Sequence, residues 1–183
     1  MQNKKTGTVA MLALVGVFSA AAVAGCGGSS ATSDADSNAQ FLSCLEAHKD
    51  TGVMPYVPDT KVQSSGGTFA VTLVESHPGT ATDSSAPGPE VRGSNTWQVA
   101  IADMSGAPVD GIAMSVSPYM PDHQHGTSLV PAVTAQNGGN YQISPLYLYM
   151  TGYWEITVNL TPPAATGAAA GPHETALFKV CIP

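Results

Sequence analysis

Alternation of apolar and polar residues is the main pattern along this chain, and it predicts β-strands. The clearest run is Tyr153–Leu160, where Trp154, Ile156 and Val158 fall on one face. A period of two is expected where one face of a strand packs on a core, and it recurs in several other segments. We therefore expect strands over Thr68–Glu75, Thr96–Asp103, Ile112–Ser117, Leu129–Ala135, Tyr141–Ile143, Tyr153–Leu160 and His173–Cys181.

Turn-forming residues separate these segments. Gly and Pro interrupt Thr51–Ser65 and His77–Gly93, which we interpret as irregular connections, and in the second we expect His77 and Glu90 to be solvated. Residues 136–140 read Gln-Asn-Gly-Gly-Asn, a hairpin turn signal because Asn and Gly accept positive φ. Short strands joined in this way favour an all-β fold, an immunoglobulin-like antiparallel β-sandwich of about seven strands.

One stretch departs from the strand period. Ala39–His48 contains good helix formers, and its less polar positions follow the i, i+3, i+4, i+7 spacing of an amphipathic helix. These positions are Phe41, Cys44, Leu45 and His48. We expect a short helix here, before the first strand, and interpret His48 as a helix-end residue and not as a ligand.

The start of the chain has the layout of a bacterial lipoprotein signal peptide. Lys4 and Lys5 precede an uncharged run of small and apolar residues that ends in Val23-Ala24-Gly25-Cys26, which resembles a lipobox. We expect cleavage before Cys26 and acylation of its thiol. An uncleaved membrane anchor or an ordinary signal peptidase site is the alternative.

The domain organisation follows from that cleavage. Residues 1–25 would be removed, residues 26–38 are Gly, Ser, Ala and Asp rich and would form a flexible tether, and residues 39–183 are enough for one domain with a core. The lipid would hold this domain in the cell envelope. Because Gly27 follows Cys26, where an Asp resembles an inner-membrane retention signal, we expect the outer membrane, facing the periplasm, in a Gram-negative cell.

Charge and cysteine content narrow the partners and the compartment. The formal net charge is −7, and we see no basic patch, so nucleic acid is not an expected partner. Contact with the membrane would come through the lipid, and an envelope protein is a possible partner.

With Cys26 acylated, Cys44 and Cys181 remain as a pair in an exported protein and should form a disulfide. The alternative roles for these two thiols are nucleophile or metal ligand.

The segment Met120-Pro121-Asp122-His123-Gln124-His125-Gly126 concentrates the candidate metal ligands of the chain. Imidazole and thioether groups suit copper, and imidazole also suits zinc, iron and nickel. In a strand, His123 and His125 would point to the same face and could share one metal. A solvated turn is the open alternative, because Pro121, Asp122 and Gly126 all favour turns.

Four short pieces between Trp97 and Val158 resemble the YtkA-like domain, a family of small exported β-sandwiches related to the FixH group. The pieces, in order, are Ser105-Gly106-Ala107-Pro108-Val109, the Met120–Gly126 segment, Gly139-Asn140-Tyr141 and Met150-Thr151-Gly152-Tyr153-Trp154-Glu155. Several relatives are encoded near genes for copper or other heavy-metal handling. The resemblance therefore implies a copper site, and the positions that match its motifs are Met120, His123, His125 and Met150.

Two functions remain open at this point. The first is a lipid-anchored extracytoplasmic module that binds metal, copper above all, as an accessory to metal handling or transport. The second is an envelope protein-interaction module without metal, in which Met150 only packs in the core. We do not expect an enzyme, because paired carboxylates and an activated nucleophile are not visible in the sequence.

Overall fold

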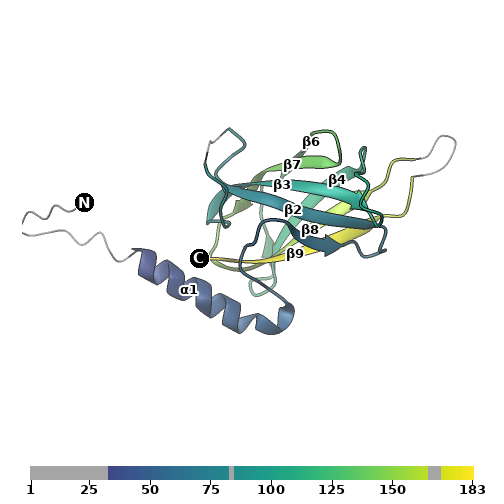
Figure 1. Ribbon diagram of the computed structural model, residues 1–183. Coiled ribbons are helices and arrows are strands. Elements are labelled where there is room, and N and C mark those ends of the chain that lie inside the picture. The colour runs from purple at the N-terminus through teal and green to yellow at the C-terminus, as the bar shows by residue number, and fades with distance from the viewer. Residues whose placement is uncertain (1–32, 83–84, 165–169) are drawn as a thin grey trace, which may run out of the picture. The chain divides into compact units, whose positions relative to one another are not determined.

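The computed structural model describes residues 33–82, 85–164 and 170–183, which form two helices and nine strands (Figure 1). The helices are α1 (Ser33–Ala47) and the 3₁₀ helix η1 (Lys49–Thr51). The strands are β1 (Thr60–Gln63), β2 (Phe69–Pro78), β3 (Gly93–Asp103), β4 (Ala113–Met120), β5 (His125–Gly126), β6 (Ala132–Ala135), β7 (Asn140–Leu148), β8 (Gly152–Thr161) and β9 (Glu174–Ile182). The expected signal peptide and Cys26 lie outside the described residues.

The strands form two antiparallel sheets, as an all-β sandwich requires. One sheet has the order β1-β2-β3-β7-β6 and the other β5-β4-β8-β9. The sequence pattern predicts seven of these strands, although β7 continues well beyond Ile143. The two that it misses are β1, which lies in the segment expected to be irregular, and the two-residue strand β5. Both are too short to show an alternation.

The core lies between the two sheets and is built from the predicted inward positions. Val71, Trp97 and Val99 of the first sheet and Trp154 and Ile156 of the second are all fully buried. Since alternate residues point to opposite faces, each strand contributes every second side chain to this layer. Trp97 meets Phe178 across it, with ring centroids 5.4 Å apart in an edge-to-face arrangement.

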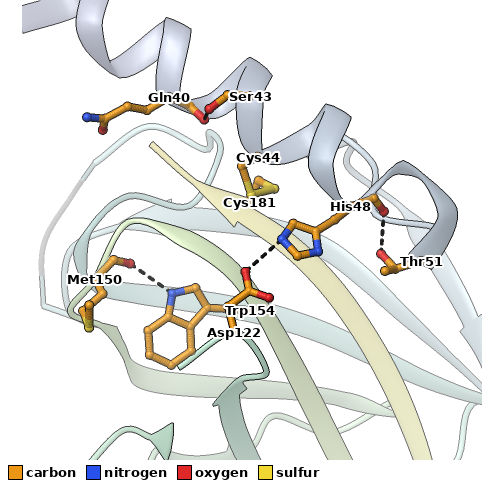
Figure 2. Close-up of a disulfide and its surroundings, with 9 residues drawn as sticks. All are labelled: Gln40, Ser43, Cys44, His48, Thr51, Asp122, Met150, Trp154 and Cys181. Atoms are coloured by element: carbon orange, nitrogen blue, oxygen red, sulfur yellow. Dashed lines mark hydrogen bonds and ion pairs between the residues drawn. A yellow bond between two sulfur atoms is a disulfide. The ribbon is translucent and has the colours of Figure 1, made fainter. Parts of the chain in front are cut away.

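Helix α1 packs on the outer face of the four-stranded sheet, against β8 and β9. Tyr153 of β8 points outward from the core but is only 2% exposed, because the helix covers it. A disulfide joins Cys44 of the helix to Cys181 of β9, with 6.0 Å between the two Cα atoms (Figure 2). The predicted helix face and the predicted disulfide are therefore both confirmed.

The helix begins at Ser33, within the stretch expected to be a tether. Residues 35–40 are exposed, whereas Cys44 and its neighbours pack on the sheet. Two effects extend the helix towards Ser33. Once packing has formed the later turns, each further residue adds one hydrogen bond without the cost of nucleation, and the negative charge of Asp36 suits the positive end of the helix dipole.

Within the described ranges, no helix combines the length and the apolar character needed to cross a bilayer.

Two residues expected to be solvated have partners instead. Glu90 is 3% exposed and accepts a hydrogen bond from Trp97 Nε1 at 2.8 Å. His77 belongs to β2, which extends further than predicted; its Nε2 lies 3.0 Å from Glu75 Oε1 and its Nδ1 lies 2.9 Å from the Ser85 carbonyl oxygen. The expectation that both are solvated is wrong, because the connection between β2 and β3 folds back onto the sandwich.

Candidate functional site

The segment Met120–Gly126 forms a tight hairpin at one end of the four-stranded sheet. Met120 is the last residue of β4 and pairs with His125 of β5. The residues between them form a turn, in which the His123 amide donates to the Met120 carbonyl oxygen at 3.3 Å. A Cβ at Gly126 would lie 2.7 Å from the Pro118 carbonyl oxygen, so the return strand can approach β4 this closely only with glycine.

The hairpin brings His123 and His125 side by side. Their ring centroids are 5.6 Å apart and their planes make an angle of 65°. His125 lies in β5 and is partly buried, whereas His123 lies in the turn and is exposed. The two rings therefore meet because of the turn, and not because they occupy alternate positions of one strand as the sequence suggests.

Tyr149 holds His125 and was not predicted from the sequence. The Tyr149 hydroxyl lies 2.8 Å from His125 Nδ1, and the two rings are stacked with centroids 5.5 Å apart. Trp154 stands edge-on to the same imidazole at 6.5 Å. The His125 ring is thus fixed on two sides, and the only sequence signal for Tyr149 is its position next to Met150.

The two methionines lie at the same end of the sandwich, in packing environments. Met120 is 1% exposed and belongs to the core, with its methyl group beneath Gly152, where an added Cβ would lie 3.1 Å away. Met150 is partly buried against the core, and its carbonyl oxygen accepts a hydrogen bond from Trp154 Nε1 at 3.0 Å (Figure 2). The antiparallel pairing of β4 with β8 explains this gathering, since the end of β4 meets the start of β8.

In the described residues, no larger cluster of metal-ligating side chains accompanies the two histidines and the two methionines. Across the ranges that the structure describes, no three His, Cys, Asp or Glu side chains converge as a metal site. A metal at this hairpin would therefore take two imidazoles, from His123 and His125, and the thioethers of Met120 and Met150 belong to the same end of the sandwich.

Residues 73–159 match the family model described as YtkA-like. This chain carries a YtkA-like domain. The match runs from β2 almost to the end of β8, and it includes the hairpin, Tyr149 and Met150. No curated protein and no solved structure matches the chain. Helix α1, β1 and β9 lie outside the matched residues, so the helix and its disulfide are additions to the matched region.

One of these additions reaches the candidate site. His48, at the end of α1, places its Nε2 2.9 Å from Asp122 Oδ2, and Asp122 immediately precedes His123 in the hairpin turn of the YtkA-like domain (Figure 2). The His48 ring also stacks on Tyr153, with centroids 4.2 Å apart and planes 16° from parallel. His48 is thus more than a helix-end residue, because it connects the disulfide-bonded helix to the turn.

The surroundings of His48 form a shallow cavity of about 400 Å³ between α1 and the start of β8. The disulfide residue Cys44, Asp122, Gly152 and Tyr153 are among its lining residues. Burial raises the pKa of Tyr153 to about 12, so its hydroxyl stays protonated and donates to Glu155 Oε1 at 2.9 Å. Tyr153 therefore contributes a neutral aromatic ring to the cavity wall, beside the Asp122 carboxyl group of the hairpin.

Proposed function

We propose that this protein is a lipid-anchored extracytoplasmic metal-binding module, most suited to copper, that acts as an accessory to metal handling or transport. The observation that carries the proposal is the contact between His123 and His125 at the tip of the hairpin. Two imidazoles at this distance, on the surface of a rigid sandwich, can converge on one ion with only side-chain rotation.

The surroundings of the pair support copper as the ion. The Tyr149 hydroxyl lies closest to Nδ1 of His125, which leaves Nε2 as the nitrogen for a metal. Met120 pairs with His125 between β4 and β5, and Met150 follows Tyr149, whose hydroxyl contacts His125. Two imidazoles with thioether ligands suit copper, and Cu(I) is preferred as the share of sulfur rises. Met120 is buried in the core, whereas Met150 is only partly buried, so Met150 is the more accessible of the two thioethers.

A competition titration tests this function. The purified chain is titrated with Cu(I) against a chromophoric chelator, and His123→Ala and His125→Ala should each lower the affinity by at least about tenfold. His173→Ala is the matched control, because His173 is exposed and lies in the connection before β9, away from the hairpin. If the double variant at His123 and His125 keeps the wild-type affinity for both Cu(I) and Cu(II), the metal function is excluded.

The anchor is part of the same proposal and rests on the sequence around Cys26. Intact-mass analysis of the membrane-derived protein should give a chain that begins at Cys26 and carries acyl groups. Cys26→Ser should abolish both processing and acylation. A mature chain that begins elsewhere, without acyl mass, would contradict the anchor while leaving the copper titration unaffected.

An envelope protein-interaction module without metal is the second candidate. Leu129 and Val130 follow the hairpin after two polar residues and are 47% and 82% exposed, which gives an apolar surface in the segment after the hairpin. In this function the His48–Asp122 contact and the buried Met120 only stabilise a structural corner. Cross-linking from Val130 in intact cells, compared between the wild type and the double histidine variant, separates the two functions, because only the metal module needs the imidazoles.

A further inference from the structure

A second cavity lies at the open edge of the sandwich, between β1 and β9. It has a volume of about 430 Å³, within the usual range for small-molecule sites. Most of its lining is apolar and includes Tyr56, Val62, Leu73, Leu177 and Phe178. The segment before β1 forms one of its walls.

Glu90 is the buried ionisable group of this cavity. Its side chain lines the cavity and is 3% exposed, and its Oε1 accepts from Trp97 Nε1. The loop around it is held in place by Asn95, whose side chain accepts from the Val91 amide and donates to the Val91 carbonyl oxygen, both at 2.8 Å. Glu90 is thus a positioned carboxyl group and not a mobile surface residue.

This carboxyl group lacks a positive partner. Within the described ranges, no Lys, Arg or His side chain forms an ion pair with Glu90. Two lysines line the cavity, but Lys61 is exposed on β1 and Lys179 donates to the Thr51 carbonyl oxygen. Burial raises the pKa of Glu90, as expected for a carboxylate whose charge is not compensated. The buried Ser76 hydroxyl lies beside this carboxyl group and partly offsets the rise in its pKa.

We propose that this cavity binds a small hydrophobic amine, with the ammonium group on Glu90 and the apolar body against the residues of β1 and β9. An ammonium ion supplies the charge that the buried carboxylate lacks and can donate to more than one oxygen. The acidic residues Glu75 and Asp59, which lie close enough to Tyr56 to act on its hydroxyl, add to the negative potential near this wall. An anionic ligand placed on Glu90 would meet a like charge there, and in the described residues neither lining lysine forms an ion pair with this carboxylate.

The test uses three probes of similar shape and different charge. The purified full chain is titrated calorimetrically with 2-phenylethylamine, 2-phenylethanol and 3-phenylpropionate. The amine should bind at least about tenfold more tightly than the alcohol, and the carboxylate should bind least. Trp97, one of the two tryptophans of the chain, should change its fluorescence on binding, because its indole donates to Glu90.

Two variants locate the binding. Glu90→Gln keeps an oxygen for Trp97 Nε1 and removes the charge, so the preference for the amine over the alcohol should disappear. Val57→Arg adds a positive charge at an exposed lining position and should weaken amine binding, whereas Val130→Arg, at an exposed position outside the cavity, should not. The proposal is overturned if the amine does not bind, if the carboxylate binds as tightly, or if the amine preference survives in Glu90→Gln. Because Val57 is exposed, its variant tests the site even if the Glu90 variant does not fold.

Discussion

His48 Nε2 lies 2.9 Å from Asp122 Oδ2, so the end of helix α1 contacts the turn that carries the candidate histidine pair. The contact is partly exposed to solvent, since the Asp122 side chain is 49% exposed. A half-exposed contact of this kind, which is an ion pair only when the imidazole is protonated, contributes at most about 1 kcal/mol to the free energy of unfolding. Its greater effect should be on the position of the turn, because Asp122 and His123 are adjacent.

Two substitutions at His48 separate its ion pair from its stacking on Tyr153. His48→Phe keeps an aromatic ring against Tyr153 and should change the free energy of unfolding by less than about 1 kcal/mol. Both His48→Phe and His48→Ala should speed amide hydrogen exchange at His123, whose hydrogen bond to Met120 closes the turn. Equal exchange at His123 in the wild type and in both variants would show that the helix does not hold the hairpin.

The disulfide between Cys44 and Cys181 should make a large contribution to stability. It closes a loop with a sequence separation of 137, and Cys44→Ala should therefore lower the free energy of unfolding by about 2–5 kcal/mol. Urea denaturation with and without reductant measures this contribution. Reductant should destabilise the wild type and leave Cys44→Ala unchanged; a wild type insensitive to complete reduction would contradict the prediction.

Tyr149 offers a test of the copper site that does not remove a ligand. Tyr149→Phe keeps the ring stacked on His125 and deletes the hydroxyl at 2.8 Å from Nδ1. Loss of such an outer hydrogen bond typically lowers metal affinity by about 10- to 100-fold. Tyr147→Phe is the matched control, since Tyr147 stacks on Tyr149 and makes no ring contact with His125. Equal Cu(I) affinities for the two variants would mean that Tyr149 does not orient the imidazole.

The sandwich could be predicted because its core strands carry their own signal. In β8, the alternation from Trp154 to Leu160 places every second side chain in the core, and all four inward residues are fully buried. In β7, the alternation is interrupted by Ser144-Pro145, and the sequence therefore indicates only its first residues, although the strand continues to Leu148. Local patterns fail where a strand is short or contains proline.

The sequence predicted which residues form the candidate site, but it did not predict which other side chains contact them. The motif pointed to His123 and His125, whereas the links from His48 to Asp122 and from Tyr149 to His125 join segments distant in the sequence. Glu90 shows the same limit, because a lone acid in a Pro- and Gly-rich stretch gives no sign that it will lie under Trp97. Burial of a polar side chain is decided by tertiary packing, which sequence periodicity does not describe.

Glu174 should stabilise the protein at neutral pH and lose this effect in acid. Burial alone would raise the pKa of its carboxyl group, but hydrogen bonds from the Ser64 hydroxyl and from the Thr68 and Gly66 amides together hold the pKa below the ordinary value of 4.5. A carboxylate with a lowered pKa in the folded state contributes stability above its unfolded pKa, and this is lost as pH falls through the folded value.

Glu174→Gln should therefore lower the free energy of unfolding at pH 7 by about 1–3 kcal/mol. The difference from the wild type should shrink steadily as pH is lowered below 4.5. Urea titrations at several pH values measure it. Ser64→Ala, which removes one of the three hydrogen bonds, should give a smaller loss with the same pH dependence, and a loss independent of pH would mean that Glu174 acts only by packing.

Glu90 should show the opposite pH dependence, because burial raises the pKa of its carboxyl group above the ordinary value of 4.5. Well below 4.5 the group is protonated in both the folded and the unfolded chain, so it adds no pH dependence. As pH rises towards the folded pKa, the unfolded chain releases the proton first, and the wild type loses stability.

Glu90→Gln stays neutral throughout, so its stability relative to the wild type should increase as pH increases and then level off. Glu46→Gln, at an exposed position of α1, is the control for the loss of one acidic side chain. Urea denaturation between pH 4 and pH 9 decides the matter: a constant difference between Glu90→Gln and the wild type would mean that the buried carboxyl group keeps its ordinary pKa.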